Sequence, residues 1–511
     1  MPRNVLADPR RRGLLALALA TGIAPGIVAC AHRRTWKSDP FALGVASGCP
    51  RPDSVVLWTR LAPAAEPGPR EQVGWELAID EGFRNVVRRG TEVVDGDVAH
   101  SVHVQASGLE PSRWYWYRFT AGGEASATGR TRTAPAPGRE EALAFAIASC
   151  QRYDDGHYAA WRHLADEAPD LVVFLGDYIY ESAPRKDRVR THSGSGAAKT
   201  LDDYRARYAQ YKSDADLQRI HASAPWILTW DDHEVQNDYA NDRGQDLAPD
   251  FLARRAAAYR AWWEHMPMPP SMRPVGPDLR IHDRYDWGAL ARFHVLDGRQ
   301  YRDVHACPPG GRGGSTTVNV ADCPDLLRAD RTLLGSAQER WLEDGLAHRD
   351  VRWNLIAQQT LMAPFTWTKE GRYWTDGWAG YPAARDRLFD AIVARKVANP
   401  VVLSGDVHCN YVCDIKRRVD DPPGAVIASE FCGTSIASAG LPQHRVAAAL
   451  PLNPHVRYGR SDERGYVALK LGASRLDASL RVVSDVEDPK ATIRTSARFS
   501  VESGRPGPQP G

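Results

Sequence analysis

The chain has 511 residues, of which 43% are hydrophobic and 25% are charged, and its formal net charge is +2. These values are ordinary for a globular protein, and the length predicts two domains with tails rather than one core. Because the charge is nearly balanced and the arginines are scattered along the chain, we expect no nucleic-acid partner. After the N-terminus no apolar run approaches the ~20 residues needed to span a bilayer.

Residues 1–31 have the pattern of an export signal. Arg11 and Arg12 precede an apolar stretch over residues 14–28, which resembles a twin-arginine signal, with a Sec-type signal as the alternative. Cys30 lies either in a cleavage site between small residues or in a lipobox, where it would carry a lipid. We therefore expect twin-arginine export machinery as a partner and a periplasmic or secreted location. Membrane contact is expected only through the signal or a lipid on Cys30.

The remaining chain divides into two expected domains and a tail. Residues 38–136 form short alternating runs separated by turn residues, which predicts a small all-β sandwich. Within it, Glu110 followed by Tyr115 resembles the tyrosine corner of fibronectin-type domains. Residues 140–485 alternate between short apolar runs and helical stretches, which predicts an α/β domain. Residues 486–511 are expected to be a C-terminal tail with a disordered Gly/Pro-rich end.

Eight cysteines fit an oxidising compartment. Cys307 and Cys323 bracket a loop rich in proline, glycine and serine, which predicts a disulfide between them. No pair or spacing of cysteines indicates a structural zinc site.

Five mostly apolar runs in the α/β region each end in a polar cluster. They cover residues 144–150, 171–175, 226–230, 353–357 and 401–403. Short buried runs separated by helical stretches are typical of a largely parallel sheet. Binding sites in such sheets gather at the carboxyl ends of the strands. Because a thiol, a phenol, carboxylates and a histidine occur at these ends, we expect a metal site and hence an enzyme.

Two of the clusters offer ligands suited to iron. Asp177 follows one strand end, and the phenol of Tyr180 comes three residues later. A phenolate is a hard, strongly donating ligand that suits Fe(III) better than Mg(II) or Ca(II). Cys150 ends another run and is either a soft anionic ligand or a buried structural cysteine. An ordinary turn with aromatic packing is the alternative for Asp177 and Tyr180.

Two further clusters are rich in carboxylates. Residues 231–234, Asp-Asp-His-Glu, come directly after an apolar run, and such crowded carboxylates need a cation or shared protons. A solvated charged turn is the alternative. Asp406 and His408 are alternate residues, so they are expected to face the same side of an extended segment.

These motifs and their order resemble the PhoD-type alkaline phosphatase/phosphodiesterase family of the metallophosphoesterase superfamily. The matching segments are residues 41–48, 149–151, 176–181, 204–211, 230–237, 380–388 and 405–408. The resemblance covers essentially the whole chain after the signal. It implies an α/β fold, a metallophosphoesterase-like β-sheet core with helices on both faces, preceded by a fibronectin-like sandwich.

The resemblance also implies a mixed iron and calcium site. Cys150, Asp177 and Tyr180 would hold Fe(III), together with His408. Other divalent metals are the alternative occupants of this site.

On the divalent side, Asp177 would bridge to Ca(II), and Asp232 and Asp406 would be the carboxylate ligands. Asn237 would serve as a carbonyl ligand or contact the substrate phosphate. His455 is a further candidate for substrate contact, with a surface histidine as the alternative.

The activity implied is hydrolysis of phosphate esters by a metal-bound hydroxide, with Asp177, Asp232 and His233 as catalytic residues. By resemblance, His233 would orient the substrate or protonate the leaving alkoxide. The alternatives are a phospholipase D-like hydrolase of head-group diesters and a non-catalytic surface binding protein. Nucleic acid stays open as a substrate, and a monomer is expected.

Overall fold

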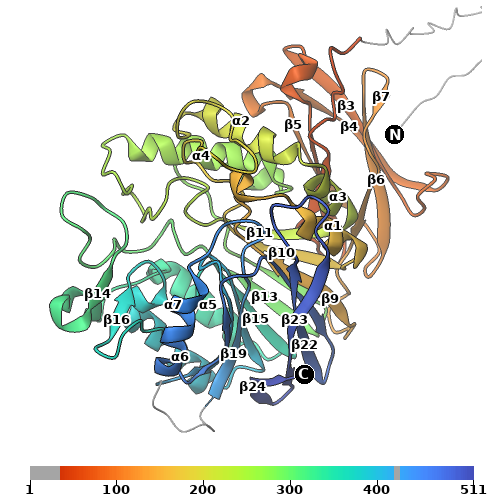
Figure 1. Cartoon of the computed structure of the whole chain (residues 1–511). Coiled ribbons are helices and arrows are strands. Elements are labelled where there is room, and N and C mark those ends of the chain that lie inside the picture. The colour runs from red at the N-terminus through yellow and green to blue at the C-terminus, as the bar shows by residue number, and fades with distance from the viewer. Residues whose placement is uncertain (1–34, 419–425) are drawn as a thin grey trace, which may run out of the picture.

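The computed structural model describes residues 35–418 and 426–511. The expected export signal, with Cys30, therefore lies outside the described residues. Within the described ranges, no helix has the length and apolar character needed to cross a membrane. Two large β-sheets form the centre of the molecule, and helices lie on their outer faces (Figure 1).

The first large sheet has ten strands in the order β24-β23-β22-β21-β9-β10-β11-β1-β2-β5. Its centre, from β9 to β1, is parallel, and the flanking pairs are antiparallel. The strands are β1 (Val45–Gly48), β2 (Ser54–Arg60), β5 (Ser101–Ser107), β9 (Leu143–Ala148), β10 (Leu171–Leu175), β11 (Pro225–Thr229), β21 (Gly465–Leu471), β22 (Arg475–Val483), β23 (Ile493–Glu502) and β24 (Arg505–Pro510). The apolar central strands are almost entirely buried, as parallel strands covered on both faces require.

The second large sheet has seven strands in the order β12-β13-β15-β17-β19-β18-β20. The strands are β12 (Asp283–Trp287), β13 (Ala291–Val295), β15 (Trp353–Ala357), β17 (Pro400–Ser404), β18 (Asn410–Lys416), β19 (Val426–Cys432) and β20 (Val456–Arg460). The four strands from β13 to β19 are parallel. The two sheets pack face to face, and the rings of Phe145 and Phe293 meet edge to face with centroids 5.4 Å apart. The expected parallel sheet is therefore present as the parallel centres of two stacked sheets.

Two of the helices that cover the sheets, α2 and α3, begin at capping side chains. The side chain of Thr200 accepts a hydrogen bond from Asp203, and the reciprocal bond completes a capping box at the start of α2. At the start of α3 the side chain of Asp214 accepts hydrogen bonds from the backbone amides of Asp216 and Leu217. The helices are α1 (Ala159–Asp166), α2 (Leu201–Lys212), α3 (Ala215–Ser223), α4 (Phe251–His265), α5 (Gly335–Ala347), α6 (Pro382–Arg395) and α7 (Gln443–Ala449).

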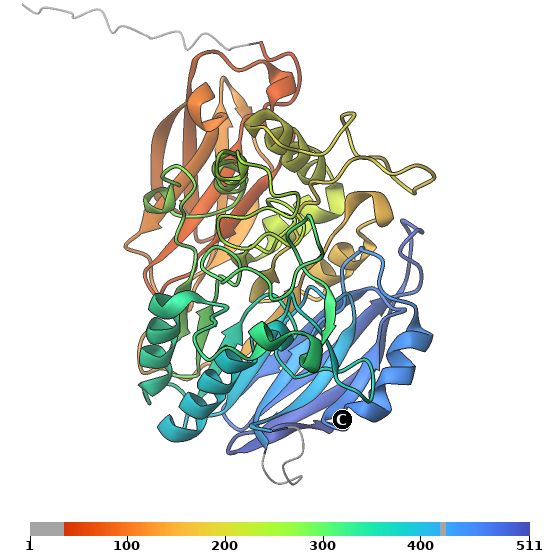
Figure 2. The ribbon, with the colours of Figure 1, turned by 90° about the vertical axis from the view of Figure 1, so that its left-hand side faces the viewer.

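The N-terminal region forms the expected all-β layer, but it shares a sheet with the α/β region. A smaller sheet of β3 (Arg70–Ala78), β4 (Val86–Asp95), β6 (Trp114–Ala121), β7 (Glu124–Ala125) and β8 (Gly129–Arg132) packs over β1, β2 and β5 around its own apolar core. β1 pairs in parallel with β11, so the sandwich is an extension of the first large sheet. The hydroxyl of Tyr115 accepts the amide of Glu110 at 2.8 Å, which is the contact of a tyrosine corner. The sandwich and the C-terminal strands lie at opposite ends of the molecule (Figure 2).

The expectation of a disordered C-terminal end is wrong. β24 is the outer strand of the ten-stranded sheet and pairs with β23. Three prolines occupy alternate positions of β24, and an edge strand tolerates them because it needs ladder hydrogen bonds on one side only. The amide of Gly507 also donates to the hydroxyl of Ser429 at 2.9 Å, which ties this strand to β19.

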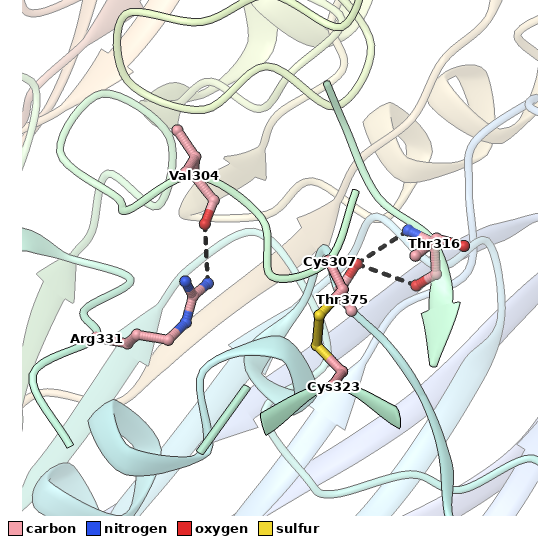
Figure 3. Close-up of a disulfide and its surroundings, with 6 residues drawn as sticks. All are labelled: Val304, Cys307, Thr316, Cys323, Arg331 and Thr375. Carbon is pink, nitrogen blue, oxygen red and sulfur yellow. Dashed lines mark hydrogen bonds between the residues drawn. A yellow bond between two sulfur atoms is a disulfide. The ribbon is translucent and has the colours of Figure 1, made fainter. Parts of the chain in front are cut away.

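The predicted disulfide between Cys307 and Cys323 is confirmed. It closes a loop that continues into β14 (Thr317–Asn319), which pairs with β16 (Arg372–Trp374) in a small separate sheet. Thr316 and Thr375 exchange backbone and side-chain hydrogen bonds next to the disulfide (Figure 3). The loop is therefore held by its own disulfide and by the contacts of Thr316 and β14 with the 372–375 segment.

Candidate metal centre

The five predicted strand-end clusters converge on one place. β9 leads to Cys150, β10 to Asp177 and β11 to Asp232, and the second sheet contributes the ends of β15 and β17. The backbone φ is 58° at Cys150, 58° at Asp177, 63° at Asp406 and 50° at His408. Such left-handed backbone at non-glycine residues is uncommon and concentrates at functional sites. Here it turns the chain sharply after each strand, so that the side chains meet.

Gly176 allows the turn after β10. Its φ is 105°, and a Cβ there would lie 2.5 Å from both the amide nitrogen and the Cβ of Asp231. Only glycine permits the β10 and β11 turns to approach each other this closely.

Gly176→Ala should lower the free energy of unfolding by more than the ~1–3 kcal/mol expected for strained backbone alone. Gly194→Ala is the matched control, because Gly194 has a φ of 84° but no heavy atom within 4 Å of its Cβ position. Denaturant unfolding of both variants measures the difference. Equal losses would show that the contact with Asp231 carries no cost.

One group of ligand atoms combines a thiol, a carboxylate and an imidazole. One ligand atom each from Cys150, Asp177 and His408 lie within 4.8 Å of one another. The Tyr180 hydroxyl is 2.8 Å from Asp177 Oδ2 and 3.1 Å from His408 Nε2. His408 Nδ1 donates to the carbonyl of Ala439 at 2.6 Å, which leaves Nε2 as the ligand atom. These four side chains could hold one cation.

A second group consists of carboxylates. Oxygens of Asp177, Asp231, Asp232 and Asp406 lie within 4.8 Å of one another. Asp231 Oδ2, Asp232 Oδ1 and Asp406 Oδ2 are buried and accept no hydrogen bond from any described residue. Buried carboxylate oxygens are normally paired, so three such atoms in one cluster fit a cation site. Asp177 belongs to both groups and is the residue that joins them.

The pKa shifts of these candidate ligand side chains are consistent with a cation bound between them. Burial first, and neighbouring carboxylates next, raise the pKa of Asp177 and Asp406 well above the usual range. Burial also raises the pKa of Cys150 and of Tyr180 well above their usual ranges. A metal ion among these groups would reverse the shifts, because it stabilises their anionic forms. Burial lowers the pKa of His408 to about 3, which keeps its ring neutral, as a metal ligand must be.

Arg299 balances part of the acidic charge. Its guanidinium bonds Asp231 at 2.5 Å and Asp376 through two bonds of 2.8 Å, and it lies 3.8 Å from Asp232. Asp231 therefore already has a cation for one oxygen, which distinguishes it from Asp232. This contact is not recognisable in the sequence, because Arg299 lies 68 residues from Asp231 and 77 residues from Asp376.

Asp232, Asp238 and Asp376 form another close set of carboxylates. Within it, Arg302 and His305 also donate to Asp376, so this carboxylate is neutralised by protein groups. Asp238 donates its backbone amide to Asp232 Oδ2 at 2.6 Å and thereby orients that side chain. Asp238 and Asp376 thus support the second group, of which Asp232 is a member.

His233 is paired with a carboxylate that the sequence interpretation did not select. Its Nδ1 lies 2.7 Å from Glu181 Oε2, and Glu181 Oε1 accepts the amide of Asn237 at 2.9 Å. Burial opposes a charged ring, but Glu181 and Asp177 raise the pKa of His233 well above its ordinary value. Because Glu181 occupies Nδ1, Nε2 is the ring nitrogen left for a substrate.

Glu234 and Gln359 hold the loops of the site in place. Glu234 accepts the backbone amides of Asp177, Tyr178 and Asp231. Gln359, at the end of β15, donates to the carbonyls of Trp230 and Leu296 in opposite sheets. Glu234, the last residue of the Asp-Asp-His-Glu cluster, is therefore structural. Gln359 joins the ends of strands from the two sheets next to the candidate metal ligands.

Comparisons with known proteins identify the family. The profile described as "PhoD-like phosphatase" matches residues 145–480, and "PhoD-like phosphatase, N-terminal domain" matches residues 28–135. The chain belongs to the PhoD-like phosphatase family. It is 43% identical over 512 residues to alkaline phosphatase D of Bacillus subtilis (strain 168), which covers 96% of this chain and 86% of that protein. It is therefore an enzyme, a phosphoric ester hydrolase.

Solved structures agree with this assignment. The structure of PhoD superposes with a TM-score of 0.88, at 43% identity and over 93% of each chain. The purple acid phosphatase PPD1 from yellow lupin (Lupinus luteus) seeds gives a TM-score of 0.57 at 14% identity, over 90% of this chain and 74% of that one. The second likeness shows the fold alone, and the fold is metallophosphoesterase-like.

In this PhoD-like phosphatase the ligand groups face an open cavity of about 820 Å³. Among the predicted site residues, six line it: Asp177, Asp232, His233, Asn237, Asp406 and His408. Cys150 and Tyr180 are buried beneath them. The cavity thus gives a substrate access to the second, carboxylate-rich group.

His455 is not part of this cavity lining. Its ring is buried, and Nε2 bonds the carbonyl of Pro364 at 2.6 Å. The neighbouring Asn453 also bonds the backbone of Thr366. His455 Nε2 therefore helps to hold the 364–366 loop, and contact of His455 with substrate stays a prediction.

Proposed function

We propose that this enzyme is an exported, metal-dependent phosphatase/phosphodiesterase that binds an iron ion and calcium at the two joined ligand groups. The observation that carries the proposal is the shared position of Asp177 between a thiol- and phenol-containing group and a carboxylate group. The likeness to alkaline phosphatase D supports a phosphoester as substrate.

The chemistry of the donors favours different metals on the two sides. Cys150, Tyr180, Asp177 and His408 would hold Fe(III), since thiolate and phenolate are strong anionic donors. Asp177, Asp232 and Asp406, with the Asn237 carbonyl, would hold Ca(II), which prefers oxygen ligands. When bound, the ions supply Lewis-acid activation of water and neutralise charge on the phosphoryl group.

Side chains of this protein position the leaving oxygen of the substrate and the carboxylates of the site. Hydrolysis breaks one P–O bond, with water supplying a hydroxyl to phosphorus and a proton to the leaving oxygen. His233 Nε2 would give its proton to that leaving oxygen, while Glu181 holds the ring through Nδ1. Arg299 keeps Asp231 and Asp376 fixed, and the Asp238 amide orients Asp232.

The proposal is tested by hydrolysis of 4-nitrophenyl phosphate and bis(4-nitrophenyl) phosphate, measured side by side with added calcium. We expect turnover of at least one ester, loss of turnover with a chelator and recovery when iron and calcium are returned. The ratio of the two rates decides between monoester and diester preference. Turnover that persists in metal-free protein would refute the proposal.

We also propose that the protein is a monomer that the twin-arginine route exports to the periplasm or the medium, where it is either free or anchored by a lipid on Cys30. The Arg11-Arg12 pair and the Cys307–Cys323 disulfide support this, because disulfides persist outside the cytoplasm. Replacing Arg11 and Arg12 by lysine should leave the protein in the cytoplasm. Unchanged export of that variant would favour a Sec-type signal.

A further inference from the structure

The cavity next to the carboxylate group continues into a wall of apolar side chains. This wall, called here the aromatic wall, consists of Leu361, Phe365, Trp367 and Trp374. The rings of Phe365 and Trp367 pack edge to face with centroids 4.9 Å apart. A cavity of about 820 Å³ has room for much more than a phosphate group, since pockets of this size enclose drug-sized molecules.

Trp374 is held in a fixed position relative to the carboxylate group. Its indole Nε1 donates to the Ser315 hydroxyl at 2.9 Å, and the Ser315 hydroxyl and amide both donate to Asp238 Oδ2. Asp238 in turn donates its amide to Asp232 Oδ2. A continuous chain of hydrogen bonds therefore links the indole to a candidate metal ligand.

The segments that carry Trp374 and Ser315 are also braced. Trp374 ends β16, which pairs with β14, and the Cys307–Cys323 disulfide closes the loop that contains Ser315 and β14 (Figure 3). Thr375 Oγ1 accepts the amide of Thr316 at 2.9 Å. A wall fixed in this way binds a ligand without the cost of ordering its own side chains.

We propose that Trp374, with Phe365 and Trp367, forms a subsite for an apolar arm of a phosphodiester. The enzyme then selects diesters whose non-leaving group is an aryl ring or an alkyl chain. This inference rests on the proposed function, because it places the phosphorus of the diester at the carboxylate group. The aromatic wall contacts the substituent and does not take part in bond breaking.

The physical reason is desolvation. An apolar arm removes both itself and the aromatic wall from water when it binds. A hydroxyl-rich arm would lose hydrogen bonds to water against the same rings and gain none in return. Apolar arms are therefore favoured over polyol arms in this part of the cavity.

The test compares substrates that share one leaving group. Methyl, octyl and phenyl 4-nitrophenyl phosphate all release 4-nitrophenolate, so they differ only in the arm that faces the wall. We expect kcat/KM, corrected for the uncatalysed rates, to be about ten- to a hundredfold higher for the octyl or phenyl ester than for the methyl ester. Separate octyl and phenyl values distinguish a chain from a ring as the preferred arm.

The decisive variant is Trp374→Ala. It should lower kcat/KM for the octyl and phenyl esters about ten- to a hundredfold more than kcat/KM for the methyl ester, and so remove most of the preference for the larger arms. Trp374→Phe should keep much of the preference, because a ring remains in place. Trp341→Ala is the matched control, since Trp341 is a half-buried tryptophan on α5 outside the cavity and should change neither value.

Binding of diphenylphosphinate and dimethylphosphinate, measured by calorimetry, provides a readout that needs no turnover. The diphenyl compound should bind the metal-loaded enzyme at least about tenfold more tightly, and Trp374→Ala should abolish that difference. Equal loss of all substrates in Trp374→Ala, or an unchanged preference, would overturn the subsite. Absence of hydrolysis together with tight diphenylphosphinate binding would instead refute the proposed reaction and keep the subsite.

Discussion

Asp177→Asn should lower phosphoester hydrolysis about a thousandfold or more and remove bound iron. Asparagine has nearly the same shape but no negative charge, and Asp177 is the carboxylate common to the thiol-containing and carboxylate groups. Losing it removes several kcal/mol of transition-state stabilisation, and each 1.36 kcal/mol corresponds to tenfold in rate. Steady-state kinetics on the two nitrophenyl esters and elemental analysis of the purified variant measure the two effects.

Asp414→Asn is the control for this variant. Asp414 is also a buried aspartate, but it lies on β18 and pairs with Arg457, away from the ligand groups. Its replacement should keep both activity and iron, although it weakens the ion pair with the half-exposed Arg457. Full activity with bound iron in Asp177→Asn would contradict the assignment of this residue.

His233→Ala should have an effect that depends on the leaving group. With an alkyl phosphate ester the rate should fall by about 10²- to 10⁴-fold, the usual range for loss of a general acid. With a 4-nitrophenyl ester the fall should be much smaller, because nitrophenolate leaves without a proton. The ratio of kcat values for the two esters, in wild-type enzyme and variant, measures the role directly.

Equal losses with both leaving groups would show that His233 positions other groups instead of donating a proton. Alanine keeps the backbone amide that His233 gives to Asp177 Oδ1, so this contact is not a source of the difference. Glu181→Gln should reproduce the leaving-group dependence in weaker form, since it removes the charge paired with Nδ1.

Much of the fold was predictable from the sequence. β9, β10, β11, β15 and β17 are apolar runs, and a strand buried on both faces leaves that pattern whichever sheet it belongs to. The same pattern does not specify pairing, and so the division into two stacked sheets and the parallel pairing of β1 with β11 appeared only in the structure. The Gly- and Pro-rich composition of the C-terminal end predicts disorder, but an edge strand accepts proline.

The candidate site was predictable where its residues directly follow a strand. Cys150, Asp177, Asp232, Asp406 and His408 do so, and the structure brings them together. Supporting residues were missed when their partners lie far away in the chain. Arg299 contacts carboxylates on two other loops, and Glu181 is recognisable only through its bond to His233. The bond from His455 Nε2 to the carbonyl of Pro364 was likewise not predictable, because the two residues lie 91 positions apart in the chain.

The central claim is that the joined ligand groups hold metal ions on which hydrolysis depends. Elemental analysis of purified wild-type protein and of Cys150→Ser, with diester hydrolysis measured on the same samples, tests it most directly. We predict iron and calcium in the active wild-type protein, and loss of both iron and activity in Cys150→Ser. Active wild-type protein without metal, or a Cys150→Ser variant that keeps iron and activity, would contradict the account.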